Sequence, residues 1–298
     1  MKLATYKDQN GTERIGAVCG DRIIALADIG FAEATMQELI RNTDPAVFAA
    51  AEAKNKLQAA LDAGKSAPLA DVTLLAPIPH PAQDVLCLGI NYMDHAAESA
   101  RAKNQAFDGK REQAVYFSKR VNEATGDKAD IPLHADITSR LDYESEFAVI
   151  LGKDADHVSR EDAWKYIFGY TIVNDVSARD VQNLHQQWHF GKSLSGCCPM
   201  GPWIVTVDEF ACPPAVGIRS YVNGELRQNS NTELLIFGVD FIIEELSQGM
   251  VLQAGSIIST GTPSGVGMGM NPPQFLKDGD EVVCEIDGIG RLTNTVRA

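Results

Sequence analysis

Two short runs of uninterrupted apolar residues most limit how this chain can fold. They cover residues 85–90 and 147–151, and each has the length of a strand. A strand that is apolar at every position is buried on both faces, so structure is expected on both sides of it. Pairs of the Asn-Gly and Asp-Gly type at 223–224 and 287–288 predict hairpin turns, and a regular alternation of strands with helices is missing. We therefore expect an α+β, β-rich fold with a mixed or antiparallel sheet.

The beginning of the chain has the pattern of a small α+β unit. Turn-forming pairs separate short β-prone runs, which predicts an antiparallel meander over residues 1 to about 30. Residues 35–38 fit a capping box at the start of one helix. The pair Asp44-Pro45 fits the start of a second helix that ends near Gly64. This part of the chain is thus expected to contain strands and helices of its own.

A proline-rich stretch follows this unit. Residues 76–81 contain alternating prolines, which is typical of a linker. The chain has 298 residues, more than most single domains. We predict a small N-terminal α+β domain over residues 1–72 and a large domain over residues 73–298.

The composition makes several kinds of partner improbable. A formal net charge of -14 and a pI near 4.8 would repel nucleic-acid phosphates and anionic membrane surfaces. No apolar run approaches the roughly 20 residues of a membrane-spanning helix. The six cysteines have no Cys-x-x-Cys spacing, and the first residues lack the pattern of a secretory signal. We expect a soluble, cytoplasmic protein with free thiols, no nucleic-acid partner and no membrane partner.

A group of acids leads directly into the second apolar run. Asp142, Glu144 and Glu146 alternate, so a strand would place them on one face, where like charges repel. An isolated pair of this kind is usually a solvated edge strand, but acids that enter a core need a cation. Asp175 follows the apolar segment 169–174, although an Asp there is often only a turn or cap residue. Carboxylates without nearby His or Cys suit Mg²⁺ or Mn²⁺ and make zinc improbable.

The motifs, taken together, resemble those of the fumarylacetoacetate hydrolase family, in its acylpyruvate hydrolase-like branch. They stand in the family's order, and the resemblance covers roughly residues 73–298. The matching motifs are Glu144-x-Glu146, the segment 169–182, Gly191-Lys192-Ser193, Gly201-Pro202-Trp203 and the segment 261–267. The resemblance implies a mixed β-sheet roll that is preceded here by the small N-terminal domain. It also implies a homodimer.

The resemblance assigns roles to individual residues. It implies that Glu144, Glu146 and Asp175 hold the metal ion. The segment Asn-Tyr-x-x-His-x-x-Glu is matched here, and on a helix its spacing places His95 and Glu98 on one face. Alone, such a pair would more often be a surface hydrogen bond. In this series of motifs it resembles a dyad in which His95 activates water as a general base and Glu98 orients and charge-stabilises the imidazole.

Other residues are expected to meet the substrate: Lys119, Gln182, Lys192 and Thr262. Lys192 would ordinarily be assumed a solvated loop lysine, but it resembles the family lysine that steadies a developing enolate. The segment around Lys119 departs from the family at Arg120, where proline is common. No catalytic role is assigned to Arg179, His185, Trp188 or His189, for which ion pairing, packing or solvent exposure is the default.

The implied reaction is metal-dependent hydrolysis of a carbon-carbon bond in a small 2,4-dioxo acid. The acid would chelate the metal through its carboxylate and 2-oxo groups, and water activated by His95 would attack C4. The leaving enolate would be neutralised by Mg²⁺ and Lys192. Decarboxylation of an oxaloacetate-like acid, keto-enol or double-bond isomerisation, and a non-catalytic metal-binding protein are the alternatives. Loss of CO₂ or isomerisation would need only the metal-stabilised enolate and a proton shuttle, so the sequence leaves them open.

Overall fold

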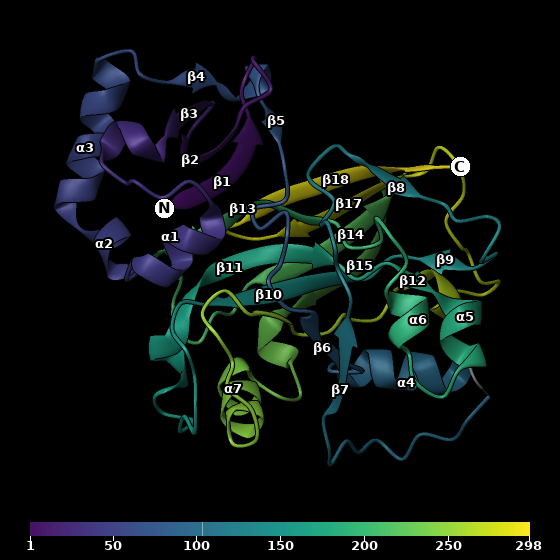
Figure 1. The fold of residues 1–298 in the computed structure, drawn as a ribbon. Helices are drawn as coiled ribbons and strands as arrows, with labels where there is room; N and C mark the ends of the chain where they lie inside the picture. Colours follow the sequence, from purple (N-terminus) through teal and green to yellow (C-terminus); the bar gives the residue numbers. More distant parts are fainter. Residues whose placement is uncertain (103) are drawn as a thin grey trace.

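The computed structural model describes residues 1–102 and 104–298, and its framework is one large mixed sheet (Figure 1). Within these residues the sheet has 11 strands in the order β4-β3-β2-β1-β13-β11-β10-β16-β6-β7, with β5 paired to β1. Strands β16 and β6 are parallel, whereas β10 and β11 are antiparallel. The strands that follow the N-terminal part are β6 (Val85–Gly89), β7 (Val115–Lys119), β10 (Ser145–Leu151), β11 (Ile167–Asn174), β13 (Met200–Thr206) and β16 (Ile257–Ser259).

A second sheet packs against the large one. Its order is β15-β14-β17-β18-β8. Its strands are β8 (Asp130–Pro132), β14 (Gly217–Val222), β15 (Glu225–Asn231), β17 (Glu281–Ile286) and β18 (Gly290–Arg297), and a separate short pair is formed by β9 (Leu141–Asp142) and β12 (Ser177–Ala178). The expected turns join β14 to β15 and β17 to β18. At the first turn, Asn223 and Gly224 have φ values of 52° and 80°, the left-handed conformations that Asn-Gly favours.

Strand β10 explains why its sequence is apolar at every position. Phe147 and Val149 on one face belong to the core between the two sheets. Ala148 and Ile150 on the other face belong to the core beneath the N-terminal helices. Burial on both faces is the arrangement that the continuous apolar run predicts, and the prediction is confirmed for β6 as well, where Cys87 belongs to the core beneath the N-terminal helices and Leu88 to the core between the two sheets.

The N-terminal segment extends the large sheet at one edge. Its elements are β1 (Lys2–Lys7), β2 (Glu13–Cys19), β3 (Arg22–Ala25), β4 (Ala67–Pro68), β5 (Thr73–Leu74), α1 (Met36–Asn42), α2 (Ala46–Ala49) and α3 (Ala51–Asp62). The expected meander is β1 to β3, and the expected capping box joins Thr35 to Glu38 at the start of α1. The expected helix from Asp44 is interrupted, because Ala50 has extended backbone. Alanine favours a helix, so the sequence does not predict the break at Ala50. Close to the break, Phe48 is buried against the rings of Phe31 and Phe168.

The two predicted domains share this sheet. Strand β1 pairs with β13, with Lys2 opposite Val205. The segment 76–81 is partly packed into the core, since Ala76 and Ile78 are 1% exposed and the Pro77 carbonyl accepts a hydrogen bond from Thr5. That stretch is therefore more than a free linker. The division at residues 72 and 73 stays a prediction.

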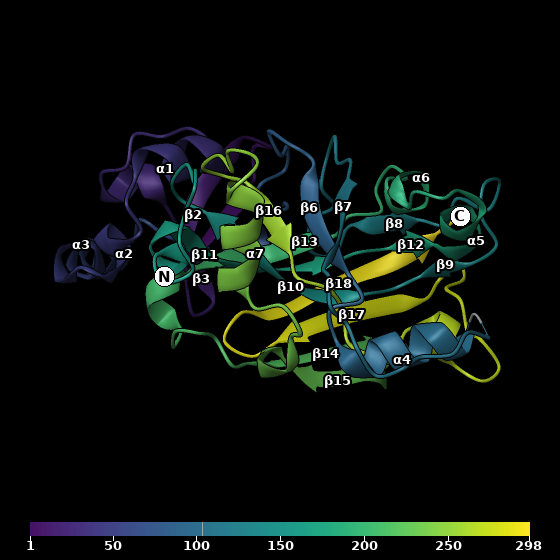
Figure 2. The same ribbon diagram turned by 90° about the horizontal axis from the view of Figure 1, so that it is seen from below.

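Most of the remaining helices lie at the end of the molecule opposite the N-terminal segment, whereas α7 (Val239–Ser247) lies nearer that segment (Figures 1 and 2). The others are α4 (Met93–Ala102), α5 (Arg179–Leu184) and α6 (His189–Lys192). In both views α4, α5 and α6 lie near the free ends of β7, β9 and β12. Among the described residues, no helix has the length and apolar character needed to cross a membrane. All six cysteines are free thiols.

Candidate metal and active site

Three buried carboxylates meet where β10 begins and β11 ends. The antiparallel register places Ser145 opposite Asn174, so Glu144 and Asp175 are neighbours across the two strands. Asp175 N donates to the Glu144 carbonyl at 2.9 Å, and Glu144 N donates to the Asn174 side chain at 3.0 Å. One carboxylate oxygen from each of Glu144, Glu146 and Asp175 lies within 4.8 Å of the others. The structure thus brings together the three predicted metal ligands.

Asp142 does not belong to this group, which corrects the expectation of one continuous acidic face. The strand is interrupted at residues 143–144, and Asp142 lies in β9, which pairs with β12. Its buried carboxylate accepts hydrogen bonds from Arg179 Nε at 2.9 Å and from the backbone of Gly267 and Met268. The alternation of acids was therefore misleading at its first position, because a change of partner strand breaks the periodicity.

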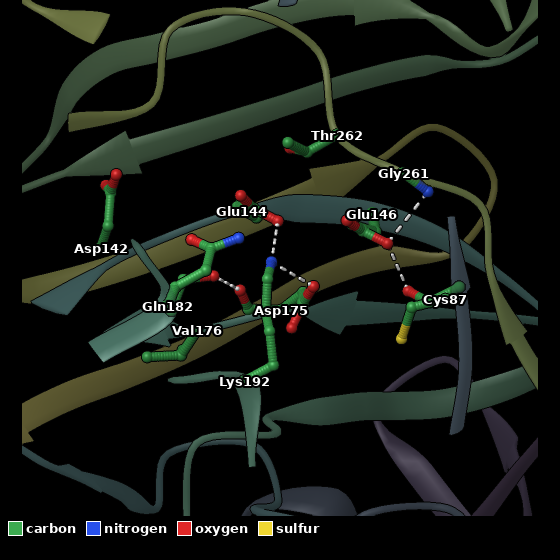
Figure 3. A network of polar contacts seen from close by, with 12 residues as sticks. Cys87, Asp142, Glu144, Glu146, Asp175, Val176, Gln182, Lys192, Gly261 and Thr262 are labelled. Carbon is green, nitrogen blue, oxygen red and sulfur yellow. Dashed lines mark hydrogen bonds and ion pairs between the residues drawn. The ribbon is translucent and has the colours of Figure 1, made fainter. Parts of the chain in front are cut away.

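Two of the three carboxylates are paired with cations. Lys192 Nζ lies 2.7 Å from Glu144 Oε2 and 2.6 Å from Asp175 Oδ2, and this contact is visible in Figure 3. Arg179 Nη1 lies 2.6 Å from Glu144 Oε1, and Lys119 Nζ lies 2.8 Å from Asp175 Oδ1. Burial by itself would raise the pKa of Glu144, but the charges of Lys192 and Arg179 lower it below its ordinary value. Glu144 is consequently an anion in this environment.

Glu146 has a different environment. Its Oε2 accepts hydrogen bonds from Ser259 Oγ at 2.5 Å and from Gly261 N at 3.0 Å, and Figure 3 marks the contact with Gly261. Burial, together with the nearby charges of Asp175 and Glu144, raises the pKa of Glu146 well above its ordinary value. A cation placed among the three carboxylates would remove this penalty.

The charge balance of the cluster fits a divalent cation. In the described part of the chain, the buried acids are Glu98, Asp142, Glu144, Glu146 and Asp175, and the buried cations beside them are Lys119, Arg179 and Lys192. With all five acids ionised and His95 neutral, five negative and three positive side chains leave two uncompensated charges. Buried charges need compensation, and oxygen ligands favour Mg²⁺ or Mn²⁺. The residues present therefore fit the metal that the sequence predicts.

The His–Glu pair lies on α4, as its spacing predicts. His95 Nδ1 is 3.1 Å from Glu98 Oε2, and both side chains are buried. Glu98 Oε1 also accepts a hydrogen bond from Gly265 N at 2.9 Å. An ionised carboxylate only accepts hydrogen bonds, so in the neutral imidazole this contact requires the hydrogen on Nδ1 and makes Nε2 the acceptor.

A small cavity joins these groups. Its polar lining consists of His95, Ser99, Glu144, Glu146, Arg179, Gln182, Asn183, Lys192 and Thr262. Thr262 Oγ1 accepts a hydrogen bond from Gln228 and donates to the Ser145 carbonyl, which fixes its position beside β10. The predicted residues Gln182, Lys192 and Thr262 thus face one space together with His95.

Lys119 and Arg179 are placed differently from expectation. Lys119, expected to bind substrate, is not among the described residues that line the cavity; it donates to Asp175 and to the Val176 carbonyl. Arg179, for which a structural role was the default, lines the cavity and bridges Asp142 and Glu144. Its place in the motif 169–182 was the signal available in the sequence. Ser259, which binds Glu146, gave no such signal.

A strand-rich fold with a buried carboxylate cluster beside a His–Glu pair defines a candidate metal-dependent enzyme. The model of the family described as "Fumarylacetoacetate (FAA) hydrolase C-terminal" matches residues 84–297. Oxaloacetate tautomerase YisK from Bacillus subtilis (strain 168) is 45% identical over 228 residues, which are 76% of this chain and 74% of that protein.

Two solved structures match this chain over its whole length. The fumarylacetoacetate hydrolase (EaFAH) from psychrophilic Exiguobacterium antarcticum is 39% identical with a TM-score of 0.83, covering 100% of this chain and 99% of that chain. The maleylpyruvate hydrolase from Sphingobium sp. SYK-6, in complex with manganese (II) ion and pyruvate, is 30% identical with a TM-score of 0.77 and the same coverage. The chain therefore belongs to the fumarylacetoacetate hydrolase family, and the predicted fold class is confirmed. Its relatives include hydrolases and a tautomerase.

Proposed function

We propose that this chain is a Mg²⁺- or Mn²⁺-dependent hydrolase that cleaves the carbon-carbon bond of a small 2,4-dioxo acid of the acylpyruvate type. The observation that carries the proposal is the cavity in which His95 faces the same space as Glu144, Glu146 and Lys192. Acid ligands, a proton acceptor and a cationic side chain are the groups that an enolate-forming hydrolysis requires. The manganese and pyruvate bound to the maleylpyruvate hydrolase give the proposal further support.

The metal would be held by Glu144, Glu146 and Asp175. When bound, it would supply Lewis-acid stabilisation of negative charge on the oxygens of the 2-oxo acid. Lys119 is assigned a positioning role, because its ammonium contacts Asp175 and it is not among the described residues that line the cavity. Lys192 would provide positive charge beside the substrate, since it lines the cavity and contacts Glu144 and Asp175.

The His–Glu pair would perform the proton transfers. His95 Nε2 would accept a proton from water as the water oxygen bonds to C4 of the substrate. Glu98 would stabilise the imidazolium through its contact with Nδ1. The C3–C4 bond then breaks, its electron pair becomes the enolate of the 2-oxo acid, and protonation at C3 completes the products. One water is consumed, and a carboxylic acid and pyruvate or a related 2-oxo acid are formed.

A second candidate is tautomerisation of an oxaloacetate-like acid. The observation that favours it is the 45% identity to the B. subtilis oxaloacetate tautomerase. This reaction needs removal of a proton at C3 and its return to oxygen or carbon, which His95 could perform without water. Decarboxylation of the same acid would use the same enolate. The two candidates therefore share the metal site and Lys192 but differ in the need for a water molecule.

The experiment that separates these candidates is a substrate panel with chemical identification of products. Acylpyruvates, fumarylpyruvate and oxaloacetate are incubated with chelator-treated protein, with and without Mn²⁺. We expect pyruvate and a carboxylic acid from acylpyruvates only when Mn²⁺ is present. Equilibration of keto and enol oxaloacetate without any cleavage of dioxo acids would instead support tautomerisation, and CO₂ release would support decarboxylation.

Replacement of His95 tests the assigned chemistry in the same assay. His95→Ala should lower the rate of hydrolysis by about 10² to 10⁴, the usual worth of a general base. The matched control is His189→Ala, since His189 is exposed and lies outside the cavity lining. Unchanged hydrolysis in His95→Ala, or full activity in the chelated protein, would contradict the proposal.

The proposed setting is the reducing cytoplasm. Its support is the thiol chemistry, since all six cysteines are free and Cys87, Cys197, Cys198 and Cys284 are buried. Burial raises the pKa of Cys198 to about 12, so this thiol stays protonated. Buried protonated thiols are compatible with a protein that needs no disulfide.

A further inference from the structure

The cavity has an apolar wall as well as its charged groups. The apolar lining consists of Leu88, Gly89, Ile90, Phe117, Trp188 and Met268. The steps of the proposed reaction use none of these side chains. A substrate anchored at the acids would direct the part of its chain beyond C4 toward one of the remaining walls. The apolar wall is therefore the place to look for substrate selection.

Trp188 is seated on this wall by a close contact with Gly89. A Cβ atom on residue 89 would lie 2.3 Å from Cζ3 and 2.8 Å from Cη2 of the indole, so any larger side chain there would displace the ring. The ring of Trp188 also meets that of Phe117 edge to face, with centroids 5.4 Å apart and planes at 67°. The missing side chain at Gly89 leaves room for the indole, and the ring of Phe117 packs against it.

The same aromatic pair is linked to the charged side of the cavity. Lys192 Nζ lies 5.1 Å from the centroid of Phe117, and this ammonium contacts Glu144 and Asp175. Phe117 thus contacts both the charged cluster and Trp188. Trp188 is only half-buried, and the neighbouring His189 and Phe190 are exposed. Trp188 therefore lines the cavity from a segment that is partly open to solvent.

We propose that Trp188, held by Gly89, is a specificity-determining residue that limits the substrate to dioxo acids with a short, apolar group beyond C4. This inference rests on the proposed function for the identity of the anchored end. A longer group would meet the indole, and a charged group would lose hydration against an apolar wall. One methylene that fits or fails to fit an apolar pocket changes selectivity by roughly 10 to 200-fold.

Binding of simple 2-oxo acids tests the wall without requiring turnover. Calorimetry in the presence of Mn²⁺ gives the affinity for pyruvate, 2-oxobutanoate, 2-oxopentanoate and 2-oxohexanoate. Trp188→Ala should raise the affinity for the longest acid relative to pyruvate by about tenfold or more. Trp188→Phe should give a smaller change in the same direction, since part of the aromatic wall remains.

A second variant changes Gly89, the residue against which Trp188 packs. Gly89→Ala should displace the indole and shift the affinity ratio in the direction of Trp188→Ala. If Gly89 acts through Trp188, the double variant Gly89→Ala/Trp188→Ala should have nearly the same affinity ratio as Trp188→Ala alone. The matched control is Phe190→Ala, because Phe190 is 51% exposed and does not line the cavity.

The outcomes separate this inference from the proposed hydrolysis. If neither Trp188→Ala nor Gly89→Ala changes the affinity ratio, the wall does not select the substrate and the inference is overturned. If the ratio shifts while the wild-type protein cleaves no dioxo acid, only the hydrolysis proposal fails. If acylpyruvates are cleaved, Trp188→Ala should move the kcat/KM preference toward longer acyl groups, and an unchanged preference would contradict the inference.

Discussion

Neighbouring acids of this chain differ in function because their partners differ. Asp142 is neutralised by Arg179 and by backbone amides, whereas Glu146 accepts two hydrogen bonds from neutral groups and lies beside other carboxylates. Only the second environment calls for an added cation. Sequence spacing identified the acids but could not distinguish these environments, since Arg179 and Ser259 reach them through tertiary structure.

Replacement of Asp142 should therefore affect stability more than metal binding. Asp142→Asn puts an amide where four donors converge, from Arg179, Tyr143, Gly267 and Met268. Breaking a buried pair in this way should lower the free energy of unfolding by about 3 to 5 kcal/mol. Mn²⁺ affinity should change by less than about tenfold, because Asp142 is not a ligand.

Denaturant titration and calorimetry measure these two effects. Asp130→Asn is a suitable control, because its ion pair with Arg297 is 3.7 Å long and exposed. Asp130→Asn should lower the free energy of unfolding by at most about 1 kcal/mol. If Asp142→Asn loses as much Mn²⁺ affinity as Glu146→Ala, Asp142 belongs to the metal site.

At the scale of elements, the turn between β6 and α4 connects the scaffold to the catalytic pair. Ile90 has a left-handed φ of 57°, an unusual conformation for a β-branched residue. The next residue, Asn91, is buried and holds the turn: its side chain donates to the carbonyls of Phe237 and Thr260 and accepts from Phe237 N. The start of α4, and with it His95, is positioned by this turn.

Loss of the Asn91 side chain should loosen that turn. Asn91→Ala removes a hydrogen-bond partner from the buried Thr260 carbonyl and from two part-buried backbone groups of Phe237, which should lower the free energy of unfolding by about 2 to 4 kcal/mol. The rate of turnover should fall as well, since the placement of His95 depends on the same turn. Thermal unfolding and kinetics check both effects, with the exposed Asn229→Ala as the control. Wild-type stability and rate in Asn91→Ala would show that the turn is held by other contacts.

The sequence predicted elements wherever local chemistry determines them. The apolar runs gave β6 and β10, and the Asn-Gly pair gave the turn after β14, because burial on two faces and left-handed backbone leave direct marks in a sequence. The interruption of the strand at 143–144 and the break at Ala50 left no such mark. Both depend on partners distant in sequence, and so does the placement of Lys119 on Asp175.

At the scale of the whole molecule, we propose a homodimer. The proposal rests on resemblance to the family, whose model matches residues 84–297. Light scattering at micromolar concentration should give twice the chain mass of 32.2 kDa. A mass equal to one chain would contradict the dimer.

The central claim is that Glu144, Glu146 and Asp175 together bind one divalent ion that the reaction requires. The most direct measurement is calorimetric titration of chelator-treated protein with Mn²⁺, for the wild type and for Glu146→Ala, with His95→Ala as the control outside the ligand set. We predict one ion per chain, a loss of affinity of at least about 100-fold in Glu146→Ala, and near-normal affinity in His95→Ala. Equal Mn²⁺ affinity in the wild type and Glu146→Ala, or full turnover without any bound ion, would contradict the account.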